Sequence, residues 1–531
     1  MAKYNNNKKK VDETHRLFDE YSEKRRVWAE HAQEDQEFRL GKQWTTEQRN
    51  TLESRGQAPI VVNRVHPAVE TAKALLTANK PGFRVSPRED SDNKVAQVFN
   101  GMLEYIWHIS EGTTVLRQIV DDYYVCGVGY GLVYQSPIMD DGKGEVCIKD
   151  IDPLDVYIDP NSRNRMFDDA ENIIISRLFT REQAKKMHPM YEKAIQNASS
   201  SQLSDRPTTD RADDGETAFP EEIETRESTD YIRGYERYYK EIVDKFRVFE
   251  KFSGKEYIFS DKQFESYMNR PVWMMNDKPV LEEEIVQKMT SRGMMVQESN
   301  MGELLQKQLI EVVQVRIPRV IQCVIMGDKY LYSRELPVEH YPIIPFMNLH
   351  TRTPYPMSDV RLVKGLQEYI NKIRSLVIAH ATTSTNAKVL IPEGSVDMKE
   401  FEEKWAQPGV GIAIDFSEGQ PVTVQPTPLP NELYKNEADA KADIDHQLGL
   451  YELMMGNSGA APQTYKATIA IDEFGQRKIK SKQADIEAGL ERMAMVAIPL
   501  MQQLYKTEKV MRITNPNNSM SEYVINKRLY D

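Results

Sequence analysis

The sequence predicts an α+β protein that is organised around two long helices. The first is expected from Ser358 to about Asn386 and the second from Asn431 to about Met455, with a short segment rich in Pro and Gly between them. Upstream of both, β-branched and aromatic runs alternate with helical patterns. A chain of 531 residues with 40% hydrophobic content can bury several cores, so roughly two to four domain-sized units are expected.

Composition excludes several classes of protein. The formal net charge is −12, whereas a protein that grips DNA phosphates over its whole surface carries a basic face. Cys126, Cys147 and Cys323 show no paired spacing, so neither a disulfide framework nor a thiolate zinc site is expected, and a reducing cytoplasm fits. The first ten residues are polar, unlike a secretory signal, and no apolar run reaches the roughly 18 residues of a membrane span.

Residues 1–44 are expected to form a charged N-terminal helix, running from Val11 to Leu40 and ending at Gly41 and Trp44. Its apolar stripe is thin and consists of Leu17, Phe18, Tyr21, Val27 and Trp28. Two interpretations remain open. The helix is either a solvated surface element, or its stripe packs on a neighbouring subunit.

Residues 45–195 read as strands and helices in alternation. Strands are expected at Pro59–Val65 and Phe83–Val85. Helices are expected at Pro67–Asn79, Asp90–His108 and Thr113–Cys126.

The glycines of Gly127-Val128-Gly129-Tyr130-Gly131 follow a helix and open a strand. A phosphate-binding fingerprint has the opposite order, so a helix C-cap and a tight turn are the better interpretation. The carboxylates of Asp150–Pro160 could hold a hard cation, but they lack the Gly and the bidentate Glu of a calcium loop. Ordinary turn chemistry explains them better.

Residues 197–229 are polar and acidic, which predicts a mobile insert. Tyr231–Phe259 and Glu311–Tyr332 alternate in the manner of antiparallel strands. Their tyrosines could stack on bases, although packing between strands is the simpler interpretation for Tyr235, Tyr238 and Tyr239. The insertion at residues 264–309 is expected to be helical and has no assigned role.

The helix of residues 358–387 begins after Pro354 and Pro356, with Ser358 as its N-cap and Asp359 at the positive end of the dipole. One buried face is expected for its packing residues Leu362, Leu366, Tyr369, Ile370, Ile373 and Leu376. Residues 388–430 are expected to form a small α/β unit with one helix at about Met398–Trp405. The second long helix follows at residues 431–455.

Residues 456–467 form a Gly- and Pro-rich joint that nearly matches a nucleophile elbow, but the second Gly is displaced and no strand precedes it. In residues 468–531 a long helix is expected at Thr468–Lys506, with Pro499 kinking it or ending a segment. A strand pair closes the chain.

No catalytic, cofactor-binding or metal-binding residue is predicted. The Gly-x-x-x-x-Gly-Lys-Ser/Thr run of an ATPase and the His-Glu-x-x-His run of a metalloprotease are both missing. His340 and His350 are expected to be surface or satisfied core residues. Acidic residues abound, but the sequence places no pair of them in one cleft, so an aspartyl nuclease has little support.

Several motifs resemble the portal (head-to-tail connector) proteins of tailed bacteriophages, most closely those of short-tailed phages. The first is Pro354-Tyr355-x-x-Ser358-Asp359, followed by Gln367, Asn371, Arg374-Ser375 and Val389–Gly394. The second is Asn63-Arg64-Val65-x-Pro67 with Asn79 and Pro81. Together with the Gly-x-Gly at Gly127 and the carboxylate run, they occur in the family's order over most of residues 45–195 and 310–510.

The resemblance implies a portal fold. It assigns residues 45–357 to a mixed α/β wing, 358–387 to a descending stem helix and 388–430 to the clip. Residues 431–455 become the ascending stem helix, 456–467 the tunnel loop, and 468–531 a kinked helix leading to a short crown. Asn457, Gln463 and Lys466 are the tunnel-loop residues expected to face DNA.

The resemblance also implies a function without enzymatic activity. The expected assembly is a dodecameric ring at one capsid vertex of the virion, assembled in the host cytoplasm, through which double-stranded DNA is packaged and ejected. Expected partners are the terminase, the tail adaptor and head-completion proteins, and the major capsid and scaffolding proteins, with no membrane and no cofactor. The alternatives are another ring-forming tail adaptor or connector, or a packaging nuclease or NTPase.

Overall fold

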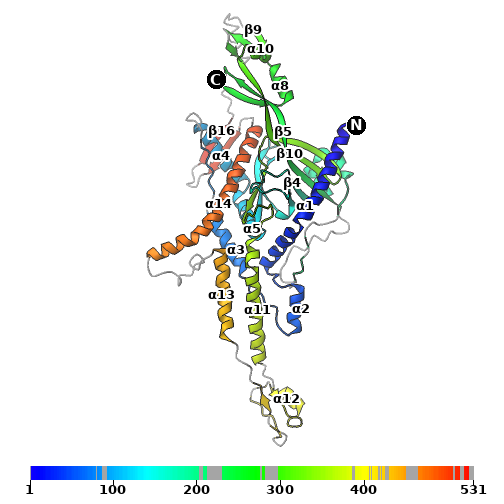
Figure 1. Cartoon of the computed structure of the whole chain (residues 1–531), viewed down its shortest axis with the longest axis vertical. Coiled ribbons are helices and arrows are strands. Elements are labelled where there is room, and N and C mark those ends of the chain that lie inside the picture. The colour runs from blue at the N-terminus through cyan, green and yellow to red at the C-terminus, as the bar shows by residue number, and fades with distance from the viewer. Residues whose placement is uncertain are drawn as a thin grey trace.

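The structure is a computed structural model, and it describes the chain with several gaps (Figure 1). The described residues are 2–78, 81–86, 93–201, 207, 209–211, 230–275, 278–280, 297–385, 389–405, 407, 409–415, 419, 421–424, 430–449, 465–505, 509–514 and 520–525. Helices and strands are both abundant, which confirms the α+β class. The molecule is elongated, with a central body from which a β-arm and a pair of helices extend in opposite directions (Figure 1).

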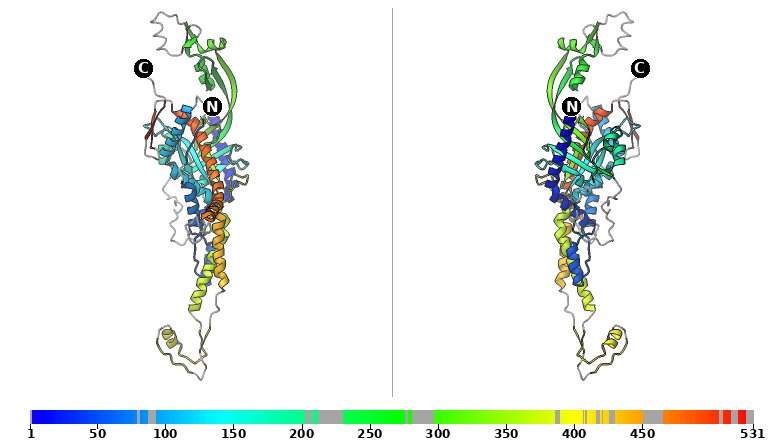
Figure 2. Two further views of the ribbon diagram at one scale, coloured as in Figure 1. Left: turned by 90° about the vertical axis from the view of Figure 1, so that its left-hand side faces the viewer. Right: turned by 90° about the vertical axis from the view of Figure 1, so that its right-hand side faces the viewer.

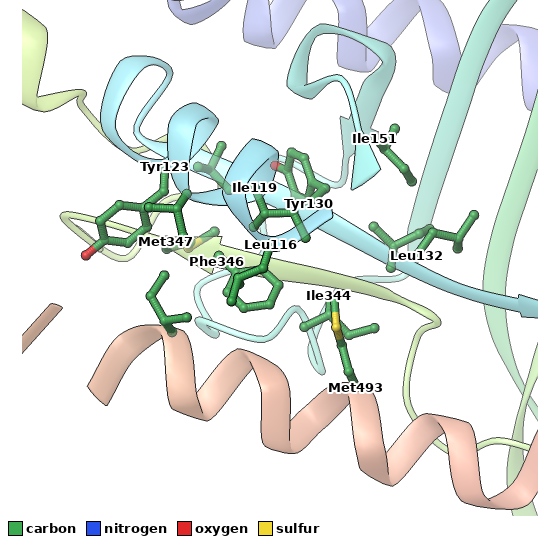
Figure 3. Packing of buried hydrophobic residues seen from close by; sticks show 14 of the residues in the cluster. Leu116, Ile119, Tyr123, Tyr130, Leu132, Ile151, Ile344, Phe346, Met347 and Met493 are labelled. Atoms are coloured by element: carbon green, nitrogen blue, oxygen red, sulfur yellow. The ribbon is translucent and has the colours of Figure 1, made fainter. Parts of the chain in front are cut away.

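The body is built on an antiparallel sheet of order β12-β1-β2, with β1 at Val128–Ser136, β2 at Glu145–Ile151 and β12 at Ile343–Met347. Helices α5 (Gly112–Val125) and α14 (Tyr465–Leu504) both contact this sheet. Figure 3 shows side chains from α5, β12 and α14 meeting in one apolar core. Helices α3 (Val65–Thr77) and α4 (Asn93–Ile109) complete the layer.

The glycines after α5 have the structural role that the sequence predicts. Gly127 has φ +82°, a left-handed conformation suited to a helix end, and β1 starts at the next residue. A Cβ atom on Gly129 would lie 2.1 Å from the carbonyl oxygen of Ile119 in α5. The glycines therefore allow the strand to approach the helix closely.

A second sheet has the order β11-β10-β5-β4-β3, and β6 pairs with β5. Its long strands β5 (Tyr231–Glu250) and β10 (Ile310–Met326) confirm the predicted antiparallel pair. The other strands are shorter: β3 at Val156–Ile158, β4 at Asn172–Thr180, β6 at Lys255–Phe259 and β11 at Lys329–Leu336. Short helices follow β4, namely α6 (Arg181–Met187), the 3₁₀ turn Pro189–Tyr191 and α7 (Glu192–Gln196).

Beyond the sheet, β5 and β10 continue as the β-arm, which curves as it leaves the body (Figure 2). The arm carries α8 (Asp261–Met268), a small sheet of order β8-β7-β9, and α10 (Met301–Gln306). The small sheet consists of β7 at Pro271–Met275, β8 at Lys278–Val280 and β9 at Gln297–Asn300. The prediction of a helical insertion at residues 264–309 was therefore wrong for this sheet, whose strands are too short for periodicity to distinguish them from helix.

The N-terminal helix α1 spans Ala2–Leu40 and is longer than expected. It is not a solvated surface helix, because Leu17, Phe18 and Tyr21 pack on Tyr157 and Ile174 of the second sheet. Within the predicted stripe Val27 is exposed and Trp28 is partly buried. The packing partner is this chain's own sheet, which neither interpretation of the sequence had named.

Two predicted strands are not strands. Residues 59–64 and 81–86 belong to no helix and to no sheet. Their amides bond to side chains instead, as when the Val85 amide donates to Asn100 Oδ1 at 2.5 Å. β-branched residues fit an extended backbone whether or not a sheet is present, so propensity alone could not separate the two cases.

The two long helices are α11 (Asp359–Thr385) and α13 (Asn431–Leu448), and they lie side by side. Between them are β13 (Val389–Leu390), α12 (Met398–Lys404) and β14 (Val422–Thr423), which confirm a small α/β unit. The second helix was expected to reach Met455. It ends at Leu448 because Gly449 caps it with φ +74°.

Helix α14 begins at Tyr465, three residues ahead of the predicted start, and continues through Pro499 to Leu504. Figure 1 shows its N-terminal part pointing away from the body, so the helix bends well ahead of the proline. The strand pair β15 (Lys509–Thr514) and β16 (Met520–Ile525) confirms the predicted C-terminal hairpin. Helix α2 (Thr46–Ser54) follows α1 and has no buried residue.

Candidate functional site

The N-terminus of α11 is attached to α1. Ser358 caps the helix as predicted, because its hydroxyl accepts from the Arg361 amide at 2.9 Å. The same hydroxyl donates to Asp35 Oδ2 of α1 at 2.6 Å. The Trp28 indole donates to the Pro356 carbonyl at 3.0 Å, so both sides of the cap hold α1 in place.

A cluster of charged side chains continues this contact. The Glu34 carboxylate accepts from Arg361 at 2.7 Å and from Lys364 at 2.6 Å. Burial alone would raise the pKa of Glu34, but hydrogen bonds from Lys364, Arg211 and Arg361 lower it to about 2. For Asp35 burial prevails over the nearby Arg361 and raises the pKa to about 6. The pKa values of these two neighbouring carboxylates on α1 are therefore shifted in opposite directions.

The next face of α11 carries a polar ladder formed by Gln367, Asn371 and Ser375. These side chains are 0%, 1% and 0% exposed and lie one helical turn apart. The amide of Arg64 donates to Gln367 Oε1 at 3.0 Å, and the amide of Val62 donates to Asn371 Oδ1 at 2.9 Å. Residues 60–64 therefore lie along α11. Side chains of α11 accept the backbone hydrogen bonds that a neighbouring strand would accept in a sheet.

The polar ladder accounts for motif residues whose role the sequence did not show. Ser375 Oγ accepts from the Ile60 amide at 3.3 Å, and Gln367 Nε2 donates to the Val62 carbonyl at 2.8 Å. Polar residues repeated every four positions within an apolar helical pattern were the available signal. Single-sequence reasoning missed it because such residues are more often on a solvated face.

A third face of α11 packs on α13 and the body. Val363 and Ile370 are fully buried in the main core, and Ile373 is 2% exposed. Arg374 forms an ion pair with the buried Glu437 of α13, and Arg64 pairs with Asp445 of α13 at 3.0 Å. The two long helices are therefore joined by both apolar and charged contacts.

Three of the predicted packing residues lie elsewhere. Leu362, Tyr369 and Leu376 are 42%, 42% and 39% exposed, while Leu366 is partly buried against the core. Leu362, Tyr369 and Leu376 recur every seven residues and form an exposed apolar stripe, called here the heptad stripe. The prediction of one buried face was wrong for Leu362, Tyr369 and Leu376. In the single chain, α11 buries the face that carries the polar ladder and the face that packs on α13. It leaves the face with the heptad stripe uncovered.

Where α14 reaches the body, Lys482 joins it to the first residue of α11. The ammonium forms an ion pair with Asp359 and donates to Asn348 Oδ1 at 2.9 Å. It also lies over the rings of Tyr124 and Tyr123, at 4.6 and 5.2 Å from their centroids. One turn on, Asp485 pairs with Arg165 at 2.7 Å. Beyond these charges α14 enters the main core through Ile486, Leu490, Met493, Val496 and Leu500.

The predicted tunnel-loop residues are placed only in part. Asn457 and Gln463 lie outside the described residues, and the helix that starts at Tyr465 includes Lys466. The predicted joint at residues 456–467 is therefore too long by its last three residues. The structure does not test the roles given to Asn457, Gln463 and Lys466.

The other polar residues considered for chemistry have local structural partners. Asp152 accepts from the Leu154 amide at 2.9 Å, and Asp159 accepts from the amides of Asn161 and Glu171 at 2.9 and 3.1 Å. Such bonds are turn chemistry. Tyr238 is buried and donates to Glu236 Oε2 at 2.9 Å, so it is a packing residue. His340 contacts Asp168 at 2.9 Å.

The far end of the molecule, at residues 389–424, exposes many large apolar side chains. Leu390, Met398, Trp405 and Val422 are 64%, 53%, 49% and 59% exposed. Among the described residues of this segment, the buried apolar side chain is Phe401, which stacks on Trp405 at 4.7 Å. This end has almost no core of its own.

Over the described residues, no helix has both the length and the apolar content that crossing a membrane requires.

Comparison with known proteins places the chain in a family. A search of curated proteins returned no match. The sequence does match the family model described as phage P22-like portal protein, over residues 15–529. This match covers nearly the whole chain, including α11, the far end and α14. The chain therefore belongs to the phage P22-like portal protein family.

Proposed function

We propose that this portal protein forms a dodecameric ring at one capsid vertex, with DNA passing along its axis during packaging and ejection. The observation that carries the proposal is the heptad stripe of Leu362, Tyr369 and Leu376. A regular apolar stripe left exposed on a long helix is typical of an interaction surface. A closed ring uses two different faces of each subunit, repeated around its axis.

The complementary face in this proposal is the outer side of α13 in the adjacent subunit. Tyr434 is 50% exposed there, and the exposed alanines Ala438 and Ala442 follow it at intervals of one turn. Small residues let a neighbouring helix approach closely while a large stripe fills the space above them. The paired helices α11 and α13 are then the descending and ascending stem helices of a tunnel wall.

The remaining assignments come from the resemblance to the portal family. Residues 45–357 form the wing, residues 388–430 the clip that docks the tail adaptor, and the segment before α14 the tunnel loop. The exposed apolar side chains of the clip suit a protein partner better than DNA. Terminase, head-completion, capsid and scaffolding proteins are the further partners in the virion and during its assembly in the host cell.

Charge favours sliding of DNA over gripping. Twelve copies of a chain with net charge −12 carry −144, so most of the ring repels phosphates at short range. Asn457, Gln463 and Lys466 are the proposed donors that contact the DNA backbone transiently. The family is structural, and we propose that the chain has no catalytic activity.

Native mass spectrometry combined with electron-microscope class averages tests the ring. The proposal predicts closed rings of about twelve subunits with a central hole. A chain that stays monomeric at high concentration and hydrolyses ATP or cleaves DNA with magnesium would instead identify a packaging enzyme. Rings that bind a tail protein but not terminase would identify an adaptor.

Deletion of residues 457–466 tests the tunnel loop separately. Rings should still form, because the proposed contacts lie on α11 and α13, while packaging or retention of DNA should fail. Loss of rings in the deletion variant would contradict the loop assignment. Replacing only Lys466 with Met should give a smaller packaging defect in the same assay.

A further inference from the structure

A short stretch within the acidic segment expected to be mobile is bound to the rest of the chain. The Thr46 amide donates to the Asp210 carbonyl at 3.0 Å, and Thr45 and Arg211 form an isolated antiparallel bridge. Thr209 Oγ1 donates to Glu37 of α1. Residues 209–211 therefore form a docked strand-like segment, so the prediction of mobility for residues 197–229 does not hold for them.

The side chain of Arg211 fills a closed site and is 2% exposed. Its Nη1 donates to the Gln43 carbonyl at 2.6 Å, and its Nη2 donates to Glu34 Oε1 at 2.5 Å. Nε reaches the same Glu34 oxygen at 3.1 Å, and Nη2 lies 3.4 Å from Glu368 of α11. The guanidinium also lies 5.2 Å from the ring centroid of Phe38. The site thus provides acceptors on several sides and an aromatic face, which suits a guanidinium.

The charges around this site require a cation. Glu34, Asp35, Glu37 and Glu368 supply four carboxylates, whereas Arg361 and Lys364 supply two positive charges that contact Glu34. His31 on α1 has a lowered pKa because of burial, so it adds little positive charge at neutral pH. Removing Arg211 would leave the partly buried carboxylates of Glu34 and Glu368 with fewer cationic partners, which is costly.

The site is also continuous with the polar ladder on α11. Gln43 is 1% exposed, its carbonyl receives Arg211, and its side-chain oxygen accepts from Asn371 Nδ2 at 2.6 Å. Whatever occupies the site therefore contacts α1, the turn after α1 and α11 at once. Binding in this site therefore depends on the relative positions of α1, the turn after α1 and α11.

We propose that α1, the turn at residues 41–46 and α11 form an arginine socket. The socket binds an extended segment that carries an arginine, and residues 209–211 occupy it in cis as a strap. The strap fastens the connection between α7 and β5 to α1 and α11. The ligand that the socket binds is a guanidinium on an extended peptide. In that peptide the carbonyl of the residue before the arginine accepts a hydrogen bond from the Thr46 amide. The proposal concerns the single chain and does not depend on ring formation.

Limited trypsin digestion measures the strap directly, because the bond after Arg211 is itself a cleavage site. In the intact chain this bond should be cut at least tenfold more slowly than the bond after Lys143, an exposed residue in the turn between β1 and β2. Glu34→Gln should speed cleavage after Arg211 about tenfold, since a hydrogen bond to a charged group is lost. Glu53→Gln on α2, which lies outside the socket, is the matched control and should leave the rate unchanged. Equal rates after Arg211 in all three proteins would overturn the proposal.

A peptide supplied in trans tests the ligand class. The Arg211→Met chain should bind a labelled peptide of residues 205–214 by fluorescence anisotropy, and the wild-type chain should bind it at least tenfold more weakly because its socket is filled. A peptide with Met in place of the arginine should lose at least tenfold in affinity for the variant. Arg211→Lys should leave trans binding intermediate, because an ammonium lacks the forked geometry. Equal affinity of both peptides for Arg211→Met would show that the guanidinium is not the ligand.

Discussion

The body and the clip at the far end of the chain differ in how they are stabilised. In the body, large side chains such as Tyr123, Tyr130 and Phe346 are 1% exposed or less and interdigitate between α5, β12 and α14 (Figure 3). In the clip, strands β13 and β14 pair over two residues each, and Leu390 and Val422 face each other across that pair while remaining exposed. The body therefore has an extensive core of its own, whereas the described residues of the segment proposed as the clip have almost none.

Helix α11 connects these regions and shares both properties. Its Asp359 end is buried among α1, α14 and the body, while its heptad stripe continues outward uncovered. In the proposed ring, stability and assembly therefore use different faces of one helix. Substitutions on the buried faces should affect folding, and those on the stripe or in the clip should affect association.

The largest expected effect comes from a charge on a buried face of α11. Ile373→Asp should destabilise the chain by about 3–5 kcal/mol, because an unpaired carboxylate replaces a side chain that is 2% exposed. Urea denaturation measures the change. Leu376→Asp, three residues away on the heptad stripe, is the matched control and should cost only about 1 kcal/mol, because Leu376 is 39% exposed. If Ile373→Asp behaves like its control, the assignment of faces to α11 is wrong.

The next largest effect concerns the junction of α14 with α11. Lys482→Met should cost roughly 3 kcal/mol, since Asp359 is then left buried without its cation. Adding Asp359→Asn should recover part of the loss, because no buried charge remains. Thermal unfolding of the single and double variants checks this coupling. Additive losses would mean that the two side chains act independently.

A smaller effect is expected from pH. The pKa of Asp35 is raised by burial to about 6, so the folded chain holds a proton that the unfolded chain releases above its ordinary pKa near 4. Asp35 therefore reduces stability as pH rises from about 4 to 6, by roughly 1–3 kcal/mol. Asp35→Asn should abolish this contribution in denaturation curves recorded across that range. Wild-type and variant chains with parallel pH profiles would contradict the burial of a proton at Asp35.

The smallest effect on folding should come from the clip. Leu390→Ser combined with Val422→Ser should alter the unfolding free energy of the body by less than about 0.5 kcal/mol, because both side chains are more than half exposed and lie outside the main core. Binding of the tail adaptor to assembled rings should nevertheless weaken, as measured by co-sedimentation. A destabilised body would show that the clip contributes to folding after all.

Periodicity and capping predicted much of the fold. The predicted bounds of α11, residues 358–387, agree with the observed helix to within two residues, because Pro356 and Ser358 define its start and the apolar spacing is regular. The phase was only partly correct. A helix with three contact surfaces buries Gln367 and exposes Leu362, and no single-sequence pattern distinguishes that from an ordinary amphipathic helix. Gly449 is a stop signal for α13 that apolar spacing alone does not show.

Contacts between distant segments could not be predicted at all. Arg211 lies in a stretch whose composition indicates mobility, yet its partners are on α1 and α11. Lys482 and Asp359 are 123 residues apart in the chain. Composition and spacing describe local structure, whereas such pairs depend on how the whole chain folds.

The most direct test of the separation between stability and assembly is a triple substitution of the heptad stripe. Leu362→Ser, Tyr369→Ser and Leu376→Ser together should leave a folded chain with an unchanged far-ultraviolet circular dichroism spectrum, because these side chains lie outside the main core and are 42%, 42% and 39% exposed in the single chain. Native mass spectrometry should then show monomers of the variant under conditions in which the wild-type chain is expected to form rings. Intact rings from the triple variant, or a chain that no longer folds, would contradict the account.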